Sequence, residues 1–148
     1  MKANPPTMVV DASVAAKWVL HEPGREHSLR ILDAYEAAEV ALLAPSLLPI
    51  EVGSVLTKRQ RRNQLSPGQV REAFRMFEIR CPVLTDVREQ MGSAMELAAL
   101  HRLAIYDCLY LALALERGCA LITADRKFYE ATCQAYTSVR LLESITAV

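Results

Sequence analysis

The sequence predicts an α/β domain of three layers, α/β/α, with a central, mostly parallel sheet of four or five strands. Short β-rich runs alternate with longer helical patterns along the chain, which is typical of a parallel sheet covered by helices on both faces. The length of 148 residues fits one domain with a continuous core. A hydrophobic content of 52% with 23% charged residues excludes a disordered or fibrous chain. We therefore expect residues 1–148 to form a single domain.

The first half of the chain contains two strand candidates and four helix candidates. The strand candidates are apolar runs bounded by polar or turn-forming residues, and the helix candidates carry apolar residues at a spacing of three or four. In order, the pattern predicts a strand at 7–11, helices at 12–21 and 25–37, a strand at 40–44, and helices at 48–63 and 67–79. Ser66 and Pro67 are residues typical of a helix start, so they set the beginning of the last of these.

The second half repeats this alternation. In order, the pattern predicts a weaker strand at 82–85, helices at 87–101 and 106–118, a strand at 120–125, a short helix at 125–134 and a final strand at 138–142. Gly118 closes the helix before the fourth strand, because glycine readily adopts the left-handed conformation that ends many helices.

Cysteine usage and hydropathy exclude several classes of protein. The four cysteines form no C-x-x-C pair and the three histidines are scattered, so no zinc site is indicated. No segment approaches the ~20 apolar residues of a membrane helix. Asp11 interrupts the apolar region that a signal peptide would need. We therefore expect a cytoplasmic protein that does not enter membranes.

Four acidic residues stand at places where the predicted fold would gather them. Asp11 ends the first strand and Asp125 ends the strand before the last helix. Ligands of open parallel sheets bind beyond the carboxyl ends of the strands, so these two aspartates are expected to face one cleft. Asp107 opens the predicted helix at 106–118, and Glu51 lies in the first turns of the predicted helix at 48–63. Each aspartate is also a candidate helix N-cap, which would be a purely structural role.

Glu51 has no such capping role. Leu47 and Leu48 lie one turn before it and Val55 one turn after, so the flanks of Glu51 face the core. An unpaired carboxylate there would be costly unless it turned outwards or met a base. Together with three aspartates at strand ends and helix starts, Glu51 indicates a cation shared by the four acids.

The order of the motifs resembles a known family. The segments "VVDASVAAKWVLHEP", "APSLLPIEVGSVLTKRQRRNQLS" and "HRLAIYDCLYLALALERGCALITADRKFY" are similar to the successive motifs of PIN-domain ribonucleases, especially VapC-like toxins of bacterial toxin-antitoxin pairs. The resemblance covers nearly the whole chain. It implies a PIN fold whose acids, here Asp11, Glu51, Asp107 and Asp125, bind Mg²⁺ or Mn²⁺ and cleave RNA. Many relatives carry a further acid where this sequence has Arg126 and Lys127, so the resemblance leaves the number of metal ions open.

The four acids have the chemistry that this reaction requires. Hard divalent cations take oxygen ligands, so carboxylates and water suffice. We assign Asp11 and Asp107 as direct metal ligands and Glu51 as a ligand through water or a holder of the attacking water. Asp125 is expected to complete or tune the site.

Two further pairs of residues have an expected role near these acids. Ser13 and Thr123 are close in sequence to the aspartates and could orient carboxylates or waters, although ordinary capping hydrogen bonds explain them equally well. Lys58 and Arg62 follow Glu51 by seven and eleven residues, which returns them to its side of the helix. They are candidates for contacting RNA phosphates, and a solvated basic face is the alternative.

The resemblance implies an antitoxin partner and a homodimer, in addition to the RNA substrate. The main alternative is a PIN-like module that binds RNA or protein without cutting. A phosphatase with an aspartate nucleophile is disfavoured, because "DASV" lacks a second aspartate two residues after Asp11. Four aromatic residues stand at helical spacing among aliphatic ones and are expected in the core or an interface: Trp18, Phe74, Phe77 and Tyr110. His101 is expected to be exposed.

Overall fold

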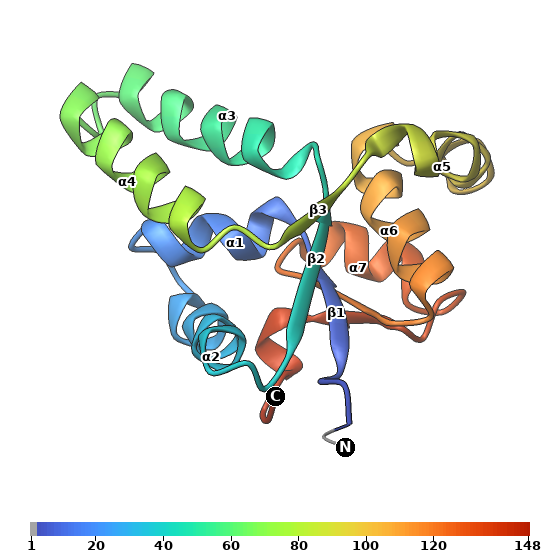
Figure 1. Cartoon of the computed structure of the whole chain (residues 1–148). Coiled ribbons are helices and arrows are strands. Elements are labelled where there is room, and N and C mark those ends of the chain that lie inside the picture. The colour runs from blue at the N-terminus through green and yellow to red at the C-terminus, as the bar shows by residue number, and fades with distance from the viewer. Residues whose placement is uncertain (1–2) are drawn as a thin grey trace.

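A parallel sheet of five strands forms the centre of the computed structural model, which describes residues 3–148 (Figure 1). The strands are β1 (Thr7–Val10), β2 (Ala41–Pro45), β3 (Val83–Thr85), β4 (Ala120–Thr123) and β5 (Val139–Leu141). The helices are α1 (Ala12–Val19), α2 (Arg25–Glu36), α3 (Leu48–Arg61), α4 (Pro67–Ile79), α5 (Val87–His101), α6 (Ile105–Arg117) and α7 (Arg126–Thr132), followed by a 3-10 turn at Leu142–Ser144. All five predicted strands and all seven predicted helices are confirmed.

The order of the strands across the sheet is β3-β2-β1-β4-β5, and every neighbouring pair is parallel. Met8 of the central strand pairs with Leu42 of β2 on one side and with Ala120 of β4 on the other. In chain order, β2 and β3 therefore lie on one side of β1, and β4 and β5 lie on its other side. The reversal lies between β1 and β4, where a parallel sheet opens a crevice at its carboxyl edge.

Helices cover both faces of the sheet, which confirms the three predicted layers. Helix α1 packs against α2, α3 and α4, and these lie on one side of the sheet in Figure 1. Helix α6 lies on the other side, packs against β1, β2 and β4, and carries α5 on its outer surface.

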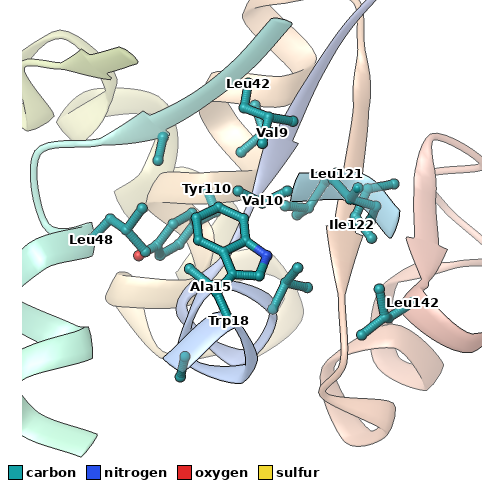
Figure 2. Packing of buried hydrophobic residues seen from close by; sticks show 14 of the residues in the cluster. Val9, Val10, Ala15, Trp18, Leu42, Leu48, Tyr110, Leu121, Ile122 and Leu142 are labelled. Carbon is teal, nitrogen blue, oxygen red and sulfur yellow. The ribbon is translucent and has the colours of Figure 1, made fainter. Parts of the chain in front are cut away.

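The core surrounds the central strands on both faces. Val9 and Val10 are both fully buried, because successive side chains of a strand point to opposite faces and helices cover each of them. Trp18 and Tyr110 enter this core from α1 and α6 (Figure 2), and the indole nitrogen of Trp18 donates a hydrogen bond to the carbonyl of Ser28. Phe77 is buried and Phe74 is partly buried, as expected for core aromatics.

Capping residues end the helices where the sequence predicts. Ser66 and Gln69 form a reciprocal capping box at the start of α4, in which each side-chain oxygen accepts a hydrogen bond from the backbone N–H of the other residue. Gly118 adopts a left-handed conformation with φ of 60° directly after α6.

One expectation about the surface is wrong. His101 is half-buried rather than exposed, and its Nε2 atom lies 2.8 Å from the hydroxyl of Tyr136. The two rings meet edge to face, so the C-terminal segment covers the end of α5.

Within residues 3–148, no single helix is long and apolar enough to cross a membrane. Helices α5 and α6 reach that length and apolar content only as a pair bent by 117°.

Candidate active site

The four predicted acids come from four elements that meet at the carboxyl edge of the sheet. Asp11 directly follows β1 and Asp125 follows β4 by two residues, so both lie at the strand reversal. Asp107 is in the first turn of α6, which packs against β1 and β4. Glu51 is in the first turn of α3, which begins three residues after β2 ends.

Asp11 is a helix cap that is also held by a neighbouring hydroxyl. Its Oδ1 atom accepts a hydrogen bond from the backbone N–H of Val14 at 3.2 Å and one from the Ser13 hydroxyl at 2.5 Å. The structural role that the sequence suggested for this residue is therefore real, and it orients the carboxylate at the same time.

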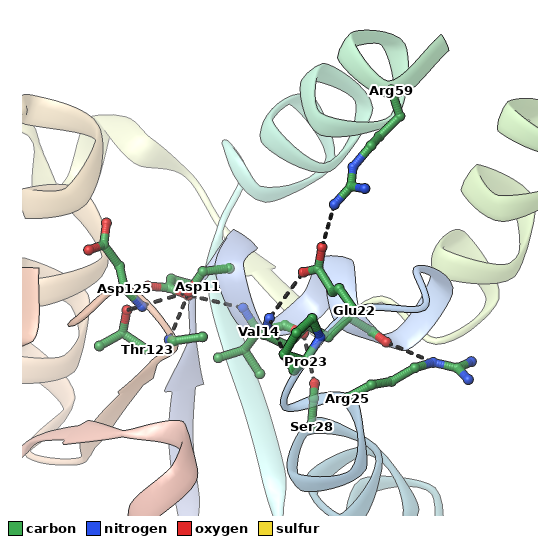
Figure 3. Close-up of polar contacts among 12 residues, drawn as sticks. Asp11, Val14, Glu22, Pro23, Arg25, Ser28, Arg59, Thr123 and Asp125 are labelled. Atoms are coloured by element: carbon green, nitrogen blue, oxygen red, sulfur yellow. Dashed lines mark hydrogen bonds and ion pairs between the residues drawn. The ribbon is translucent and has the colours of Figure 1, made fainter. Parts of the chain in front are cut away.

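Ser13 and Thr123 tie the ends of β1 and β4 together. The Ser13 oxygen accepts a hydrogen bond from the N–H of Ala124 at 2.8 Å and lies 3.5 Å from the Thr123 hydroxyl. The Thr123 oxygen accepts from the N–H of Asp125 at 3.0 Å, as the cluster in Figure 3 shows. This chain of contacts sets the position of Asp125 relative to Asp11.

The other two aspartates differ in their local roles. Asp125 caps α7 by accepting the N–H of Phe128 at 3.0 Å. Asp107 does not cap its helix, because the N-cap of α6 is Ala104. Among the described residues no side chain or backbone group donates a hydrogen bond to the Asp107 carboxylate, so capping does not explain this acid.

Burial raises the pKa of three of the acids. It raises the pKa of Asp11 to about 6, an effect that the hydrogen bonds from Ser13, Thr123 and Val14 only partly offset. Burial also raises the pKa of Glu51, and the nearby Asp107 adds to that effect. The pKa of Asp107 is raised by burial and then by the charge of Asp125. The acids are therefore close enough to repel one another.

No basic side chain within residues 3–148 forms an ion pair with any of these four acids. The contrast is Glu22, in the loop after α1, which the sequence pattern did not single out. Its carboxylate lies 3.1 Å from the amine of Lys17 and 2.7 Å from the guanidinium of Arg59 (Figure 3). Two basic side chains thus neutralise Glu22, whereas the four acids of the sheet edge have no such partner within residues 3–148.

The acid site suits a hard cation in its donor chemistry, because every donor is a carboxylate oxygen and Oε1 of Glu51 is buried without a hydrogen-bond partner. The side chains do not yet converge on one point. Over the part of the chain that the structure describes, no three His, Cys, Asp or Glu side chains form a ready-made metal cluster.

The hydroxyl of Tyr110 lies near Glu51, although the sequence predicted a core or interface role for this residue. Its oxygen is buried without a partner, and so is Oε1 of Glu51. The two groups are close enough for each to shift the pKa of the other. No hydrogen bond of ordinary distance and angle joins them as the side chains stand. Helical spacing among aliphatic residues gave no signal for this contact.

Basic residues lie further along α3. Lys58 and Arg62 are exposed, and neither forms an ion pair with an acid of the described chain. Arg59, between them in sequence, turns towards Glu22 instead. At the start of α7, Arg126 forms an ion pair with Glu143. Arg126 is one of the two basic residues at the position where relatives were expected to carry a further acid.

Comparison with known proteins agrees with this fold. The PIN domain family matches residues 8–132, and the chain therefore belongs to the PIN domain family. It is similar to Ribonuclease VapC3 of Pyrobaculum aerophilum, at 32% identity over 129 residues that cover 83% of this chain and 92% of the relative. The crystal structure of PAE2754 from Pyrobaculum aerophilum has the same fold, with a TM-score of 0.72 at 21% identity over 95% of this chain and 94% of that one.

Proposed function

We propose that this PIN domain is an endoribonuclease that depends on Mg²⁺ or Mn²⁺. The observation that carries the proposal is a group of carboxylates at the strand reversal that repel one another and have no cation within the described chain. Membership of the PIN domain family and the likeness to a protein named Ribonuclease VapC3 support RNA as the substrate.

The residues have distinct roles in this proposal. Asp11 and Asp107 hold the cation directly, because they come from the central strand and from the helix that packs on it. Glu51 holds it through water or positions the attacking water, and Asp125 completes the site. A bound Mg²⁺ or Mn²⁺ would acidify that water and shield the charge that develops on the phosphate.

Ser13 and Thr123 support the acids in this proposal. The Ser13 hydroxyl donates to Asp11, and its oxygen accepts from the backbone next to Asp125. Ligating carboxylates commonly receive such hydrogen bonds, which fix the direction of their free oxygen.

The biological setting extends the proposal. A VapC-like toxin would act on RNA in the cytoplasm, form a homodimer and be inhibited by a cognate antitoxin protein. The name of the relative, Ribonuclease VapC3, supports this setting. The experiment in the next paragraph determines which RNA is cut.

The test is cleavage of total cellular RNA by purified, partner-free protein, with mapping of new RNA ends. We expect new ends in Mg²⁺ or Mn²⁺ and none in chelator. Folded protein that binds RNA without producing ends in either metal would instead establish a PIN-like binding module.

Reversing the charges of Lys58 and Arg62 to Glu is expected to weaken RNA binding, because both are exposed, Lys58 on α3 and Arg62 at the C-cap of that helix. Each lost phosphate contact should reduce the slope of log affinity against log salt by roughly 0.7 for single-stranded RNA. Binding is measured across a salt series in an Asp107→Asn background that does not cut. The matched control reverses Arg30 and Arg140, which are exposed on α2 and β5. Equal slopes for the two double variants would contradict the predicted contact.

A further inference from the structure

We propose that Tyr110 is a positioning residue of the acid site, whose hydroxyl donates a hydrogen bond to Oε1 of Glu51 and so directs the other carboxylate oxygen towards the metal-binding edge. This inference rests on the proposed function, because it gives Glu51 its place as a metal or water ligand. It adds Tyr110 to the four acids and to Ser13 and Thr123, as a residue that touches neither metal nor RNA.

The position of Tyr110 brings its hydroxyl to the start of α3. Tyr110 lies one turn after Asp107 on α6 and is only 2% exposed. Figure 2 shows its oxygen on the side of Leu48, which is one turn before Glu51 on α3. The tyrosine ring therefore spans the core between the helix that carries Asp107 and the helix that carries Glu51.

One oxygen of the Glu51 carboxylate and the hydroxyl of Tyr110 are both buried without a hydrogen-bond partner. Among residues 3–148, three buried side-chain atoms have no hydrogen-bond partner, and two of them are Oε1 of Glu51 and the hydroxyl of Tyr110. One is an acceptor and the other is a donor. Buried polar groups in folded proteins are nearly always paired, so a small rotation of either side chain that joins them is favoured.

The hydroxyl also needs an explanation of its own. Phenylalanine would fill the same space in the core without burying a polar atom, so packing alone does not account for tyrosine at this position. Burial and the charges of Glu51, Asp11 and Asp107 raise the pKa of Tyr110 above its ordinary value. The group therefore stays a phenol and acts as a donor to a carboxylate rather than as a metal ligand.

A donor behind a ligating carboxylate has a defined effect. A carboxylate that accepts a hydrogen bond on one oxygen presents the other in a fixed direction, and loss of such a contact typically weakens metal binding by about 10-fold to 100-fold. In this site the donor would hold Glu51 against the repulsion of Asp107, which otherwise pushes the two carboxylates apart.

The experiment measures Mn²⁺ affinity from the electron paramagnetic resonance signal of free Mn²⁺. Tyr110→Phe is expected to bind Mn²⁺ about 10-fold more weakly than wild type. The matched control is Tyr106→Phe, which removes an exposed hydroxyl from the first turn of the same helix and is expected to leave the affinity unchanged. With RNA, Tyr110→Phe should lower kcat at saturating RNA and leave KM unchanged.

A double-mutant cycle with Glu51→Gln separates positioning from general destabilisation. If Tyr110 acts through Glu51, Tyr110→Phe has no further effect on Mn²⁺ affinity in the Glu51→Gln background. Equal losses in both backgrounds would overturn the proposal, as would unchanged affinity of the single variant. If Tyr110→Phe does not fold, the near-ultraviolet tyrosine difference spectrum on addition of Mn²⁺ replaces this measurement. We expect the spectrum in wild type and none in Glu51→Gln. A spectrum common to both proteins would overturn the proposal.

The same data distinguish failure of this inference from failure of the proposed function. Wild type that binds no Mn²⁺ and leaves RNA intact overturns both. Wild type that binds Mn²⁺ and cleaves RNA, with Tyr110→Phe matching it in affinity and kcat, overturns only the role of Tyr110.

Discussion

Asp107→Asn is expected to lower the metal-dependent rate of RNA cleavage by about 1000-fold, with the fold retained. Removing one preorganised group from an active site lowers the rate by up to about 1000-fold. We expect Asp107→Asn to reach this limit, because the amide keeps the shape of the side chain but removes its charge. Asp107 is not a helix cap, so this change costs α6 no capping hydrogen bond. The measurement is the single-turnover rate on the RNA identified from mapped ends, with a thermal melt of each protein.

Asp86→Asn provides the matched control. Asp86 also follows a strand of the sheet, β3, and caps the next helix by accepting the N–H of Arg88 at 2.9 Å. Unlike the acid site, Asp86 has its own cation, because Arg88 pairs with it and lowers its pKa to about 2. We expect its cleavage rate to stay within about twofold of wild type, since surface changes away from a site have small effects. A full rate for Asp107→Asn, or equal losses for both variants, would remove Asp107 from the proposed site.

The free energy of unfolding of metal-free protein is expected to fall as the pH rises from 4 to 7, by roughly 2 kcal/mol from Asp11 alone. The pKa of Asp11 is about 6 in the folded protein against an ordinary value of 3.8. Between these values the folded state binds more protons than the unfolded state, so rising pH favours unfolding. Glu51 and Asp107, whose pKa values are also raised, act in the same direction.

Asp11→Asn isolates this contribution. Asparagine still accepts the capping hydrogen bond from Val14 but carries no charge, so the variant should be more stable than wild type at pH 7 and equally stable at pH 4. Mg²⁺ or Mn²⁺ should raise the melting temperature of wild type more than that of the variant. Urea unfolding in chelator across this pH range measures the effect, with Asp33→Asn, an exposed change on α2, as control. Parallel pH profiles of wild type and Asp11→Asn would contradict the buried, repelling carboxylate.

Local patterns in the sequence determined the elements of this fold. All five strands and seven helices follow from apolar periodicity, and helix ends such as Ser66 and Gly118 follow from capping chemistry. These signals act within a few residues along the chain, so they are readable without knowledge of the fold. The motif order also predicted the PIN domain family, which the comparisons confirm.

The tertiary structure alone decided which acids differ from ordinary capping residues. Asp86, Asp11 and Asp125 all follow strands and cap helices, yet of these three only Asp86 has an ion-pair partner in the part of the chain that the structure describes. Glu22 also has a cation beside it, because Arg59 of α3, which is 37 residues away in sequence, donates a hydrogen bond to its carboxylate. The pairing of Glu22 with Arg59 depends on a contact between distant elements, which local periodicity does not encode, whereas Arg88 is only two residues from Asp86 in sequence.

The hydroxyl of Tyr110 is the clearest case of this division. Its spacing on α6 predicted a core residue, and the ring is indeed buried. Tyr110 comes near Glu51 only because β1 and β2 lie side by side in the sheet, so that α6, which packs on both strands, lies near the start of α3, which follows β2. The sequence by itself therefore determined the helices, the strands and the candidate acids. The order of the strands decided which charged side chains lie close to one another, because electrostatic and hydrogen-bonding contacts depend on distance in space rather than along the chain.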